Sequence, residues 1–207
     1  MRSPTPSRKT ATRADPHSDL RIIGGRFRGR KLSFPAVDGL RPTGDRIRET
    51  LFNWLAPDLP QSRCLDLFAG SGALGFESLS RGADFVLMLE KHPRAHQSLV
   101  QNLQKLAIDN AQILLNDSLK SLAQKPALPF DIAYLDPPFS ADLWQAAAEL
   151  LESNEWLTPD ACIYVELPKD HPFIAPRSWR LHRDKIAGAV SYRLYYRHVT
   201  SETEIPD

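Results

Sequence analysis

The sequence predicts an α/β fold, with a mostly parallel sheet of seven strands, helices on both faces and a terminal antiparallel hairpin. The first observation is that short apolar runs alternate with segments of helical periodicity from Cys64 onward. Such alternation is typical of right-handed βαβ units in a parallel sheet. The second observation is that the alternation stops near the C-terminus, where residues 187–189 join two β-rich runs directly. Polar and apolar residues alternate along the last run, as in an antiparallel pair with one covered face.

The predicted elements follow one another with ordinary lengths. Apolar runs predict strands at Cys64–Phe68, Asp84–Leu89, Gln112–Leu115, Asp131–Leu135 and Ala161–Leu167. Helical periodicity predicts helices at Ala73–Arg81, Pro93–Leu106, Ser118–Gln124 and Ala141–Ser153. The terminal hairpin is predicted at Trp179–Ile186 and Val190–Val199. These elements define one main domain, residues 43–200, followed by a short tail, residues 201–207.

The bulk composition is that of a globular protein, because 42% of the 207 residues are apolar and 25% are charged. The polar residues 1–20 predict a disordered basic tail without the apolar core of a signal peptide. No window reaches the ~18 apolar residues that span a bilayer. Cys64 and Cys162 lie in apolar runs and are predicted to be buried free thiols of a cytoplasmic protein. A sheet covered by helices on both faces needs no partner, so we expect a monomer.

The front of the chain is basic and the rest is acidic. Residues 1–48 hold twelve Lys/Arg and four Asp/Glu, whereas residues 49–207 hold fourteen and twenty-one. Residues 21–42 predict a small hairpin extension with glycine turns. A basic front on an acidic body favours a nucleic-acid partner, although a solvated charged face is the alternative. The candidate RNA-binding residues are Arg26, Arg28, Arg30, Lys31, Arg41 and Arg46.

A helix is predicted after the hairpin, with Thr43 or Asp45 as its cap. Its apolar face comprises Ile47, Leu51, Phe52, Trp54 and Leu55. Arg41, Arg46 and Arg48 cluster at its N-terminal end, where cations are unfavourable. This cluster suggests an anionic ligand, and arginines that simply extend into solvent are the alternative.

A cofactor site is predicted at the ends of the first three strands of the main domain. Residues 70–75 read Gly-Ser-Gly-Ala-Leu-Gly between a predicted strand and helix, and such glycines allow a tight turn and close ligand approach. Glu90 closes the second strand, where a carboxylate accepts from ribose hydroxyls. Asp117 follows the third strand and could accept from an adenine amino group, although both acids could be simple caps. The candidate cofactor residues are Asp66, Phe68, Gly70, Ser71, Gly72, Glu90, Lys91, Asp117 and Ser118.

Asp66 distinguishes two cofactors that the glycine pattern allows. A dinucleotide would bring a pyrophosphate to this loop, and a carboxylate four residues before Gly70 would repel it. S-adenosylmethionine has no phosphate and carries a cationic amino group and a sulfonium. An acidic loop therefore favours S-adenosylmethionine, with a cap or turn role for Asp66 as the alternative.

A second candidate site follows the fourth strand, at Asp136-Pro137-Pro138-Phe139. Two prolines lack N–H groups and restrict the preceding residue to extended geometry, so the strand must stop at Asp136. The stiff loop that results presents a carboxylate, backbone carbonyls and an aromatic ring, which suit a planar amino group such as that of a nucleobase. In a 3-2-1-4-5 strand order, this loop lies beside the glycine loop. The candidate catalytic residues are Asp136, Pro137 and Phe139, and no metal-ligand spacing is present.

These motifs resemble the class I S-adenosylmethionine-dependent methyltransferases that modify exocyclic amino groups. Residues 21–25, 28–32 and 41–55, with residues 154–157, resemble the RsmD family, which methylates guanine N2 in bacterial 16S ribosomal RNA. The resemblance runs from about Arg21 to Arg197 and implies a Rossmann-like fold and a small-subunit substrate. Gly44 departs from the pattern, since a second threonine is expected after Thr43.

The resemblance implies that Asp136 and the Pro137 carbonyl hold the amino group while Phe139 stacks on the base. An adenine-N6 methyltransferase acting on DNA or RNA is the nearest alternative, because it presents an amino group to the same loop. An NAD-dependent oxidoreductase and an RNA-binding protein without catalysis are further alternatives. Asp66 argues against the former, whereas the intact glycines, Glu90 and Asp136 argue against the latter.

Overall fold

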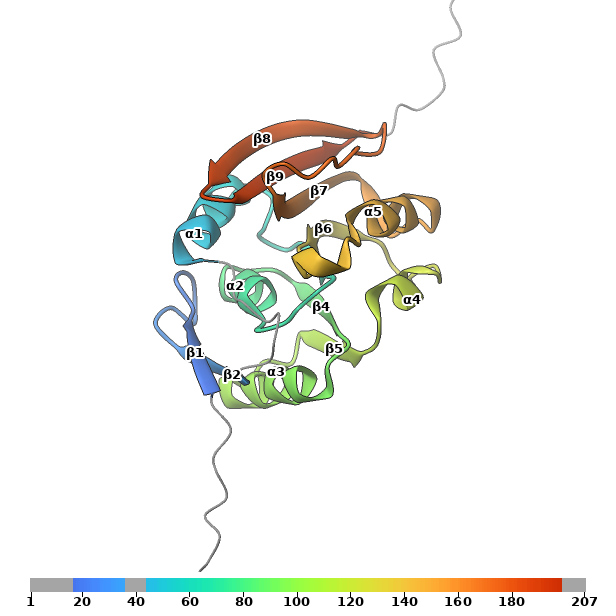
Figure 1. Ribbon diagram of the computed structural model, residues 1–207. Coiled ribbons are helices and arrows are strands. Elements are labelled where there is room, and N and C mark those ends of the chain that lie inside the picture. The colour runs from blue at the N-terminus through green and yellow to red at the C-terminus, as the bar shows by residue number, and fades with distance from the viewer. Residues whose placement is uncertain (1–16, 36–43, 199–207) are drawn as a thin grey trace, which may run out of the picture.

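The computed structural model describes residues 17–35 and 44–198 (Figure 1). A small hairpin, β1 (His17–Arg21) and β2 (Lys31–Pro35), precedes helix α1 (Asp45–Trp54). The main domain then contains β3 (Arg63–Asp66), α2 (Ala73–Ser80), β4 (Phe85–Glu90), α3 (Pro93–Leu106), β5 (Ala111–Leu115), α4 (Ser118–Leu122) and β6 (Phe130–Leu135). It ends with η1 (Phe139–Ala141), α5 (Trp144–Ser153), β7 (Leu157–Pro168), β8 (Trp179–Ala187) and β9 (Val190–Arg197).

The seven-stranded sheet has the order β5-β4-β3-β6-β7-β9-β8. Strands β3 to β7 are parallel, whereas β9 pairs antiparallel with both β7 and β8. The predicted fold class and the predicted 3-2-1-4-5 order of the first five strands are therefore confirmed. The order reverses between β3 and β6, which is where ligands bind in open α/β sheets.

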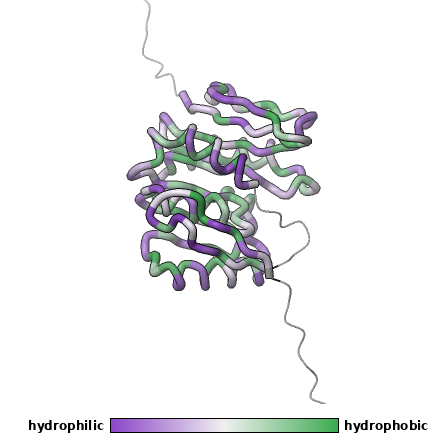
Figure 2. Tube along the Cα trace, turned by 90° about the vertical axis from the view of Figure 1, so that its left-hand side faces the viewer, coloured by the Kyte–Doolittle hydropathy of each residue, from purple (hydrophilic) through white to green (hydrophobic). Residues whose placement is uncertain are grey.

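Two apolar cores cover the two faces of the sheet. Alternate strand residues point to opposite faces, so Cys64 belongs to the core under α1, α2 and α3, and Leu65 to the core under α4 and α5. The central strands are apolar on both faces. Figure 2 shows hydrophobic stretches of the trace, in green, alternating with hydrophilic ones, in purple. Cys64 and Cys162 are buried free thiols, as predicted. None of the helices in residues 17–35 and 44–198 is long and apolar enough to cross a membrane.

The hairpin is longer than predicted. Strand β1 begins at His17, so the prediction of a tail is wrong for residues 17–20, while residues 1–16 lie outside the described residues. Leu20, Ile22, Leu32 and Phe34 are buried, because the hairpin packs against the α2 and α3 side of the sheet. On the α3 side, Ser98 Oγ and Asn102 Nδ2 donate to the Ser33 carbonyl over 2.5 and 3.0 Å.

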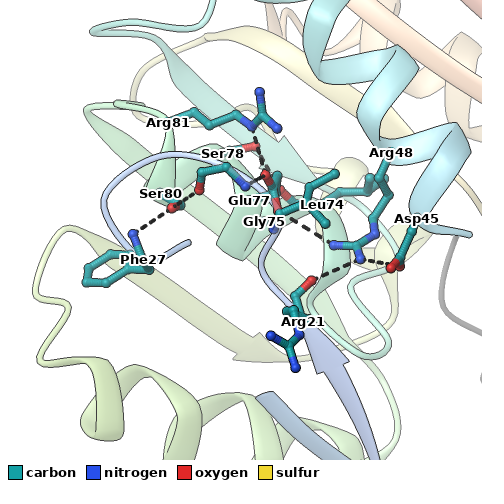
Figure 3. Close-up of polar contacts among 12 residues, drawn as sticks. Arg21, Phe27, Asp45, Arg48, Leu74, Gly75, Glu77, Ser78, Ser80 and Arg81 are labelled. Carbon is teal, nitrogen blue, oxygen red and sulfur yellow. Dashed lines mark hydrogen bonds and ion pairs between the residues drawn. The ribbon is translucent and has the colours of Figure 1, made fainter. Parts of the chain in front are cut away.

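Glu77 of α2 anchors the turn of the hairpin (Figure 3). Its carboxylate is fully buried and accepts from the backbone N–H groups of Ile23 (2.9 Å) and Gly24 (2.8 Å). Two cations surround it, Arg81 at 2.7 Å and the fully buried Arg48 at 3.6 Å. The charge of Glu77 thus offsets two arginines and satisfies two backbone donors, which joins three segments of the chain.

Gly25 and Gly29 make a matched test of how the turn packs. Both have positive φ, +72° and +83°, but a Cβ on Gly25 would lie 1.8 Å from the Ser80 carbonyl oxygen, whereas one on Gly29 meets nothing within 4 Å. We expect Gly29→Ala to cost about 1–2 kcal/mol from backbone strain alone. Gly25→Ala should cost about 1–3 kcal/mol more, because the turn must move off α2. Denaturant unfolding of both variants checks this, and equal losses would contradict the packing argument.

Three element boundaries differ from prediction. Helix α1 is preceded by Gly44 with no side-chain cap, and Asp45 binds Arg48 instead, so the prediction of an Asp45 cap is wrong. Thr43 lies outside the described residues. Helix α5 begins at Trp144 rather than Ala141, because the preceding residues form the η1 turn and Asp142 adopts a left-handed φ of 49°. Strand β7 begins at Leu157, four residues before the predicted Ala161.

Candidate active site

The loops after β3, β4 and β5 are joined by hydrogen bonds at the carboxyl edge of the sheet, and strand β6 is bonded to the end of β3 beside them. Gly70 N–H donates to Glu90 Oε2 over 2.8 Å, which links the first two loops. Ser118 Oγ donates to the Leu67 carbonyl, which adds the third. Leu67 N–H donates to the Tyr134 carbonyl over 3.3 Å, which adds the strand before Asp136. The predicted convergence of the four loops is therefore present in the fold.

The glycine loop is tightly built, for a reason that differs from the prediction. A Cβ on Gly72 would lie 2.5 Å from the Phe76 ring, and one on Gly75 would lie 2.7 Å from Met88 Sδ. Both positions therefore need glycine because the protein itself fills the adjacent space. Gly70 has a φ of 52° and is partly exposed, and contact of the glycine loop with a ligand stays a prediction.

Glu90 binds the backbone at the first glycine of the glycine loop. Its two carboxylate oxygens accept from Gly70 N–H (2.8 Å) and His92 N–H (2.7 Å). A carboxylate has about four lone-pair positions, so these bonds leave acceptor capacity for a ribose. The neighbouring Lys91 is exposed. Contact of either residue with a cofactor stays a prediction.

Asp117 is the N-cap of α4, where its Oδ1 accepts from Lys120 N–H over 3.2 Å. The cap role that the sequence left open is thus real, and it fixes the carboxylate at the carboxyl edge. Ser118 is buried and uses its hydroxyl to hold the β3 loop, so it acts inside the protein. Contact of Asp117 with an adenine amino group stays a prediction.

Asp66 lies beneath the glycine loop and is only 3% exposed. Its Oδ2 accepts from Gly75 N–H over 3.1 Å, which ties the strand to the start of α2. Burial raises the pKa of Asp66 to about 7, against backbone hydrogen bonds from Gly75 and Phe68 that lower it. The carboxyl is therefore partly protonated at neutral pH. This weakens the argument that its charge excludes a dinucleotide, and it favours a role in positioning the loop.

The raised pKa of Asp66 predicts how Asp66→Asn changes stability with pH. The folded carboxyl titrates near 7 and the unfolded one near 3.8, so between these values only the folded state retains the proton. The free energy of unfolding of the native chain therefore falls as pH rises, by up to about 1.4 kcal/mol per unit from this group. Asparagine does not titrate, so the variant should gain relative to the native chain between about pH 5 and about pH 7. Denaturant unfolding at several pH values checks this, and a constant difference would contradict it.

The loop after β6 has the predicted stiff geometry. Asp136 follows Leu135, and the 3-10 turn η1 closes with Ala141 N–H donating to the Pro138 carbonyl over 2.8 Å. This turn does not use the carbonyl of Pro137, which is a buried residue, and contact of that carbonyl with a ligand stays a prediction. Phe139 is 42% exposed, and its ring lies 5.8 Å from the buried Trp144 ring, which supports it from within the protein.

The basic residues do not gather at this edge. Arg26, Arg28 and Arg30 are exposed on the hairpin turn, which packs on the C-terminal end of α2, whereas the glycine loop lies at its N-terminal end. The two ends of this helix are about 12 Å apart. Lys31 is exposed and pairs with Asp19 at 3.5 Å, Arg46 is exposed on α1, and Arg41 lies outside the described residues.

Arg48 corrects the predicted arginine cluster. Its side chain is fully buried and binds Glu77, the Arg21 carbonyl (3.0 Å) and Asp45 (2.6 Å). It therefore stabilises the hairpin rather than binding an anionic ligand. Among the described residues, Arg46 is therefore the one member of the predicted arginine cluster that is exposed.

Two polar residues near the candidate site were missed by the sequence reasoning. Glu166 lies within the buried part of β7, Ala161–Leu167, and Lys185 of β8 lies 5.8 Å from the Trp54 ring. Strand pairing puts Glu166 opposite Tyr192 and Tyr192 opposite Lys185. The signal for Glu166 was a single acidic residue in an otherwise apolar strand, Ala161–Leu167.

Comparison with known proteins places this geometry in context. A family model described as "Conserved hypothetical protein 95" matches residues 20–196. The ribosomal RNA small subunit methyltransferase D of Escherichia coli K12 is 48% identical over 186 residues, which are 89% of this chain and 93% of that protein. The protein of the same name from Haemophilus influenzae is 51% identical over 180 residues, 86% of this chain and 93% of that protein.

Solved structures share the fold. An Escherichia coli structure described as "Putative methyltransferase yhhF" matches with a TM-score of 0.81 and 48% identity, covering 88% of this chain and all (100%) of that one. A Thermus thermophilus 16S rRNA N2 G1207 methyltransferase, RsmC, in complex with AdoMet and guanosine, matches with a TM-score of 0.64. The two chains are 21% identical, and the match covers 88% of this chain and 50% of that chain. This match therefore shows the fold alone.

Proposed function

The chain belongs to the family of the ribosomal RNA small subunit methyltransferases D, RsmD, and we propose that it methylates the exocyclic N2 amino group of a guanine in 16S ribosomal RNA. The methyl donor is S-adenosylmethionine, and the substrate is RNA of the small ribosomal subunit, in the cytoplasm. The sequence resemblance to the RsmD family is confirmed, and the proposal applies that family's reaction to this chain.

The observation that carries this proposal is the position of the Asp136-Pro-Pro-Phe loop beside the glycine loop. Strands β3 and β6 are hydrogen-bonded neighbours, with Asp66 opposite Tyr134. Asp136 is two residues beyond Tyr134, at the point where the strand order reverses. A methyl donor over β3 and an amino group on the β6 loop would therefore be adjacent, which is what direct transfer needs.

The residues at the end of β3 fit S-adenosylmethionine. The partly exposed Gly70 has no side chain to obstruct a ligand, and Glu90 and Asp117 present carboxylates along the same edge. Oxygen acceptors at these positions suit ribose hydroxyls and an adenine amino group. S-adenosylmethionine supplies, when bound, a methyl group activated by its sulfonium. We assign the predicted cofactor residues Phe68, Ser71 and Lys91 to the same loops, with Asp66, Gly72 and Ser118 supporting them from within.

The chain's own part in the reaction is to position a weak nucleophile. The lone pair of the guanine N2 is delocalised into the ring, so it attacks only when it is oriented. The Asp136 carboxylate and the Pro137 carbonyl each accept one N2 hydrogen, which directs the lone pair away from the loop. The negative charge of Asp136 also favours the positive charge that develops on N2 during transfer. Phe139 stacks on a base that has left its helix, a contact that contributes about 1–3 kcal/mol.

The exposed cations of the hairpin turn support contact with an extended RNA. Arg26, Arg28 and Arg30 lie away from the site, so they would bind phosphates of the substrate at a distance from the target base. Removing residues 1–35 would expose the core that Leu20, Ile22, Leu32 and Phe34 help to build. Neutralising the exposed arginines is therefore a cleaner test of RNA binding than truncation. We propose that the protein acts as a monomer.

Nucleoside mass spectrometry tests the proposed function. Purified protein is incubated with S-adenosylmethionine and with small-subunit particles or naked RNA from bacteria that lack the methylation. The expected product is N2-methylguanosine. N6-methyladenosine would instead support the adenine alternative, and no methylated nucleoside would overturn the proposal.

A further inference from the structure

We infer that Glu166 is a specificity-determining residue, whose carboxylate accepts the N1–H of the target guanine while Asp136 holds the adjacent N2 amino group. The inference rests on the proposed function and deepens it, because it gives a physical reason why the base is guanine rather than adenine. The Asp136-Pro-Pro-Phe loop by itself grips an amino group of either base.

Strand register places Glu166 beside Asp136. Leu135 of β6 pairs with Val165 of β7, so Asp136 and Glu166 are the next residues on two neighbouring strands, about 4.8 Å apart. Two residues earlier, Tyr134 pairs with Tyr164, and their ring centroids are 6.4 Å apart. Since side chains alternate along a strand, Glu166 lies on the same face as Tyr164.

The Tyr164 hydroxyl links the two acids. It donates to Glu166 Oε2 over 2.7 Å and is itself buried. Burial has the largest effect on the pKa of Tyr164 and raises it. The charges of Glu166 and Asp136 raise this pKa further, so both carboxylates lie near the Tyr164 hydroxyl. The carboxylate of Glu166 retains acceptor positions after this bond, because its two oxygens carry about four lone pairs.

Aromatic and charged residues of neighbouring elements surround Glu166. Glu166 is 7% exposed, and burial raises its pKa while the Tyr164 hydrogen bond lowers it. Tyr192 of the neighbouring strand β9 is paired with Glu166, and Lys185 of β8 is paired with Tyr192. Trp54 stacks on Tyr192 with 5.4 Å between ring centroids, which covers the far side. The Glu166 carboxylate accepts from the Tyr164 hydroxyl through Oε2, and a second donor at Oε1 would further favour its charged form.

Base chemistry supplies that donor. Guanine presents N1–H next to its N2 amino group, so adjacent carboxylates at Asp136 and Glu166 accept along one edge. Adenine presents a lone pair at N1 next to its N6 amino group, which would face the Glu166 oxygen without a hydrogen bond. Sites built to hydrogen-bond one group discriminate strongly against analogues that lack it, because the buried polar atom is left unpaired.

The test replaces the target guanine by 2-aminopurine in reconstituted small-subunit particles. This analogue keeps the N2 amino group but has an acceptor at N1. The native protein should methylate guanine about ten- to a hundredfold more efficiently in kcat/KM than 2-aminopurine. Glu166→Gln should bring this ratio close to one, because an amide can present either its oxygen or its NH2 group.

Tyr164→Phe is the matched control, because it removes the hydrogen bond to Glu166 but keeps the carboxylate. It should retain the preference for guanine, and S-adenosylhomocysteine binding reports that each variant is folded. An unchanged ratio in Glu166→Gln, or equal rates for both bases with the native protein, overturns the inference. Those results leave the proposed function standing, whereas absence of N2-methylguanosine with the native protein overturns the proposed function as well.

Discussion

Asp136→Ala is expected to abolish methylation while S-adenosylmethionine still binds. The carboxylate orients the target amino group and stabilises the charge that develops on it, and loss of one such preorganised group costs about 10²–10³-fold in kcat. The cofactor residues lie on the loops after β3, β4 and β5, so cofactor affinity should change by less than about threefold. Single-turnover methyl transfer and calorimetric titration with S-adenosylmethionine measure the two effects separately.

Asp142→Asn is the matched control for Asp136. Asp142 lies six residues further along, with a side chain that is 73% exposed and 3.3 Å from His171. Asparagine tolerates its left-handed backbone, so the fold should not change. Its methylation rate should stay within about twofold of the native rate. Full activity in Asp136→Ala, or an equal loss in both variants, would show that the β6 loop does not hold the reacting group.

Glu77→Gln is expected to cause the largest loss of stability, about 3–5 kcal/mol. The substitution removes the charge that offsets the fully buried Arg48, whose Nε and Nη1 have no hydrogen bond within the described chain. It also replaces one of the two carboxylate oxygens by an NH2 donor, so the N–H group of either Ile23 or Gly24 loses its acceptor. Denaturant unfolding measures the loss.

Two further variants separate the buried charge from general disruption. Asp45→Asn removes the exposed partner of Arg48 and should cost less than about 1 kcal/mol. Adding Arg48→Met to Glu77→Gln should recover part of the stability, because the uncompensated buried cation is gone. A loss below about 1 kcal/mol for Glu77→Gln would mean that the hairpin is held by its apolar residues alone.

The order of elements and the meeting of the candidate-site loops at one edge could be predicted from the sequence. Apolar periods of two and of about 3.6 residues are local, so the strands and helices from Cys64 onward were predicted to within a few residues. Pro137 and Pro138 end β6 for a reason that acts within one peptide unit. Ligands bind at the carboxyl ends of strands where the strand order reverses, and this rule predicts one shared edge for Gly70, Glu90, Asp117 and Asp136.

The partners of charged side chains were decided only by the tertiary structure. Arg48 was expected near a ligand, but it is buried against Glu77, a residue far along the chain. Asp66 was expected to present charge, but burial beneath α2 makes it partly neutral. Gly72 and Gly75 were expected to serve a tight turn and close ligand approach, and the structure adds that a Cβ at either position would meet Phe76 or Met88.

The physical reason is the same in each case. A periodic pattern determines which face of an element is buried, because that depends on neighbours three or four residues away. Desolvation and pairing of a charge depend on groups that folding brings from distant segments, such as the hairpin, α1 and α2 around Glu77. The sequence by itself thus determined the fold and the edge at which the four loops meet, whereas the tertiary structure decided which polar residues are buried and pair with one another.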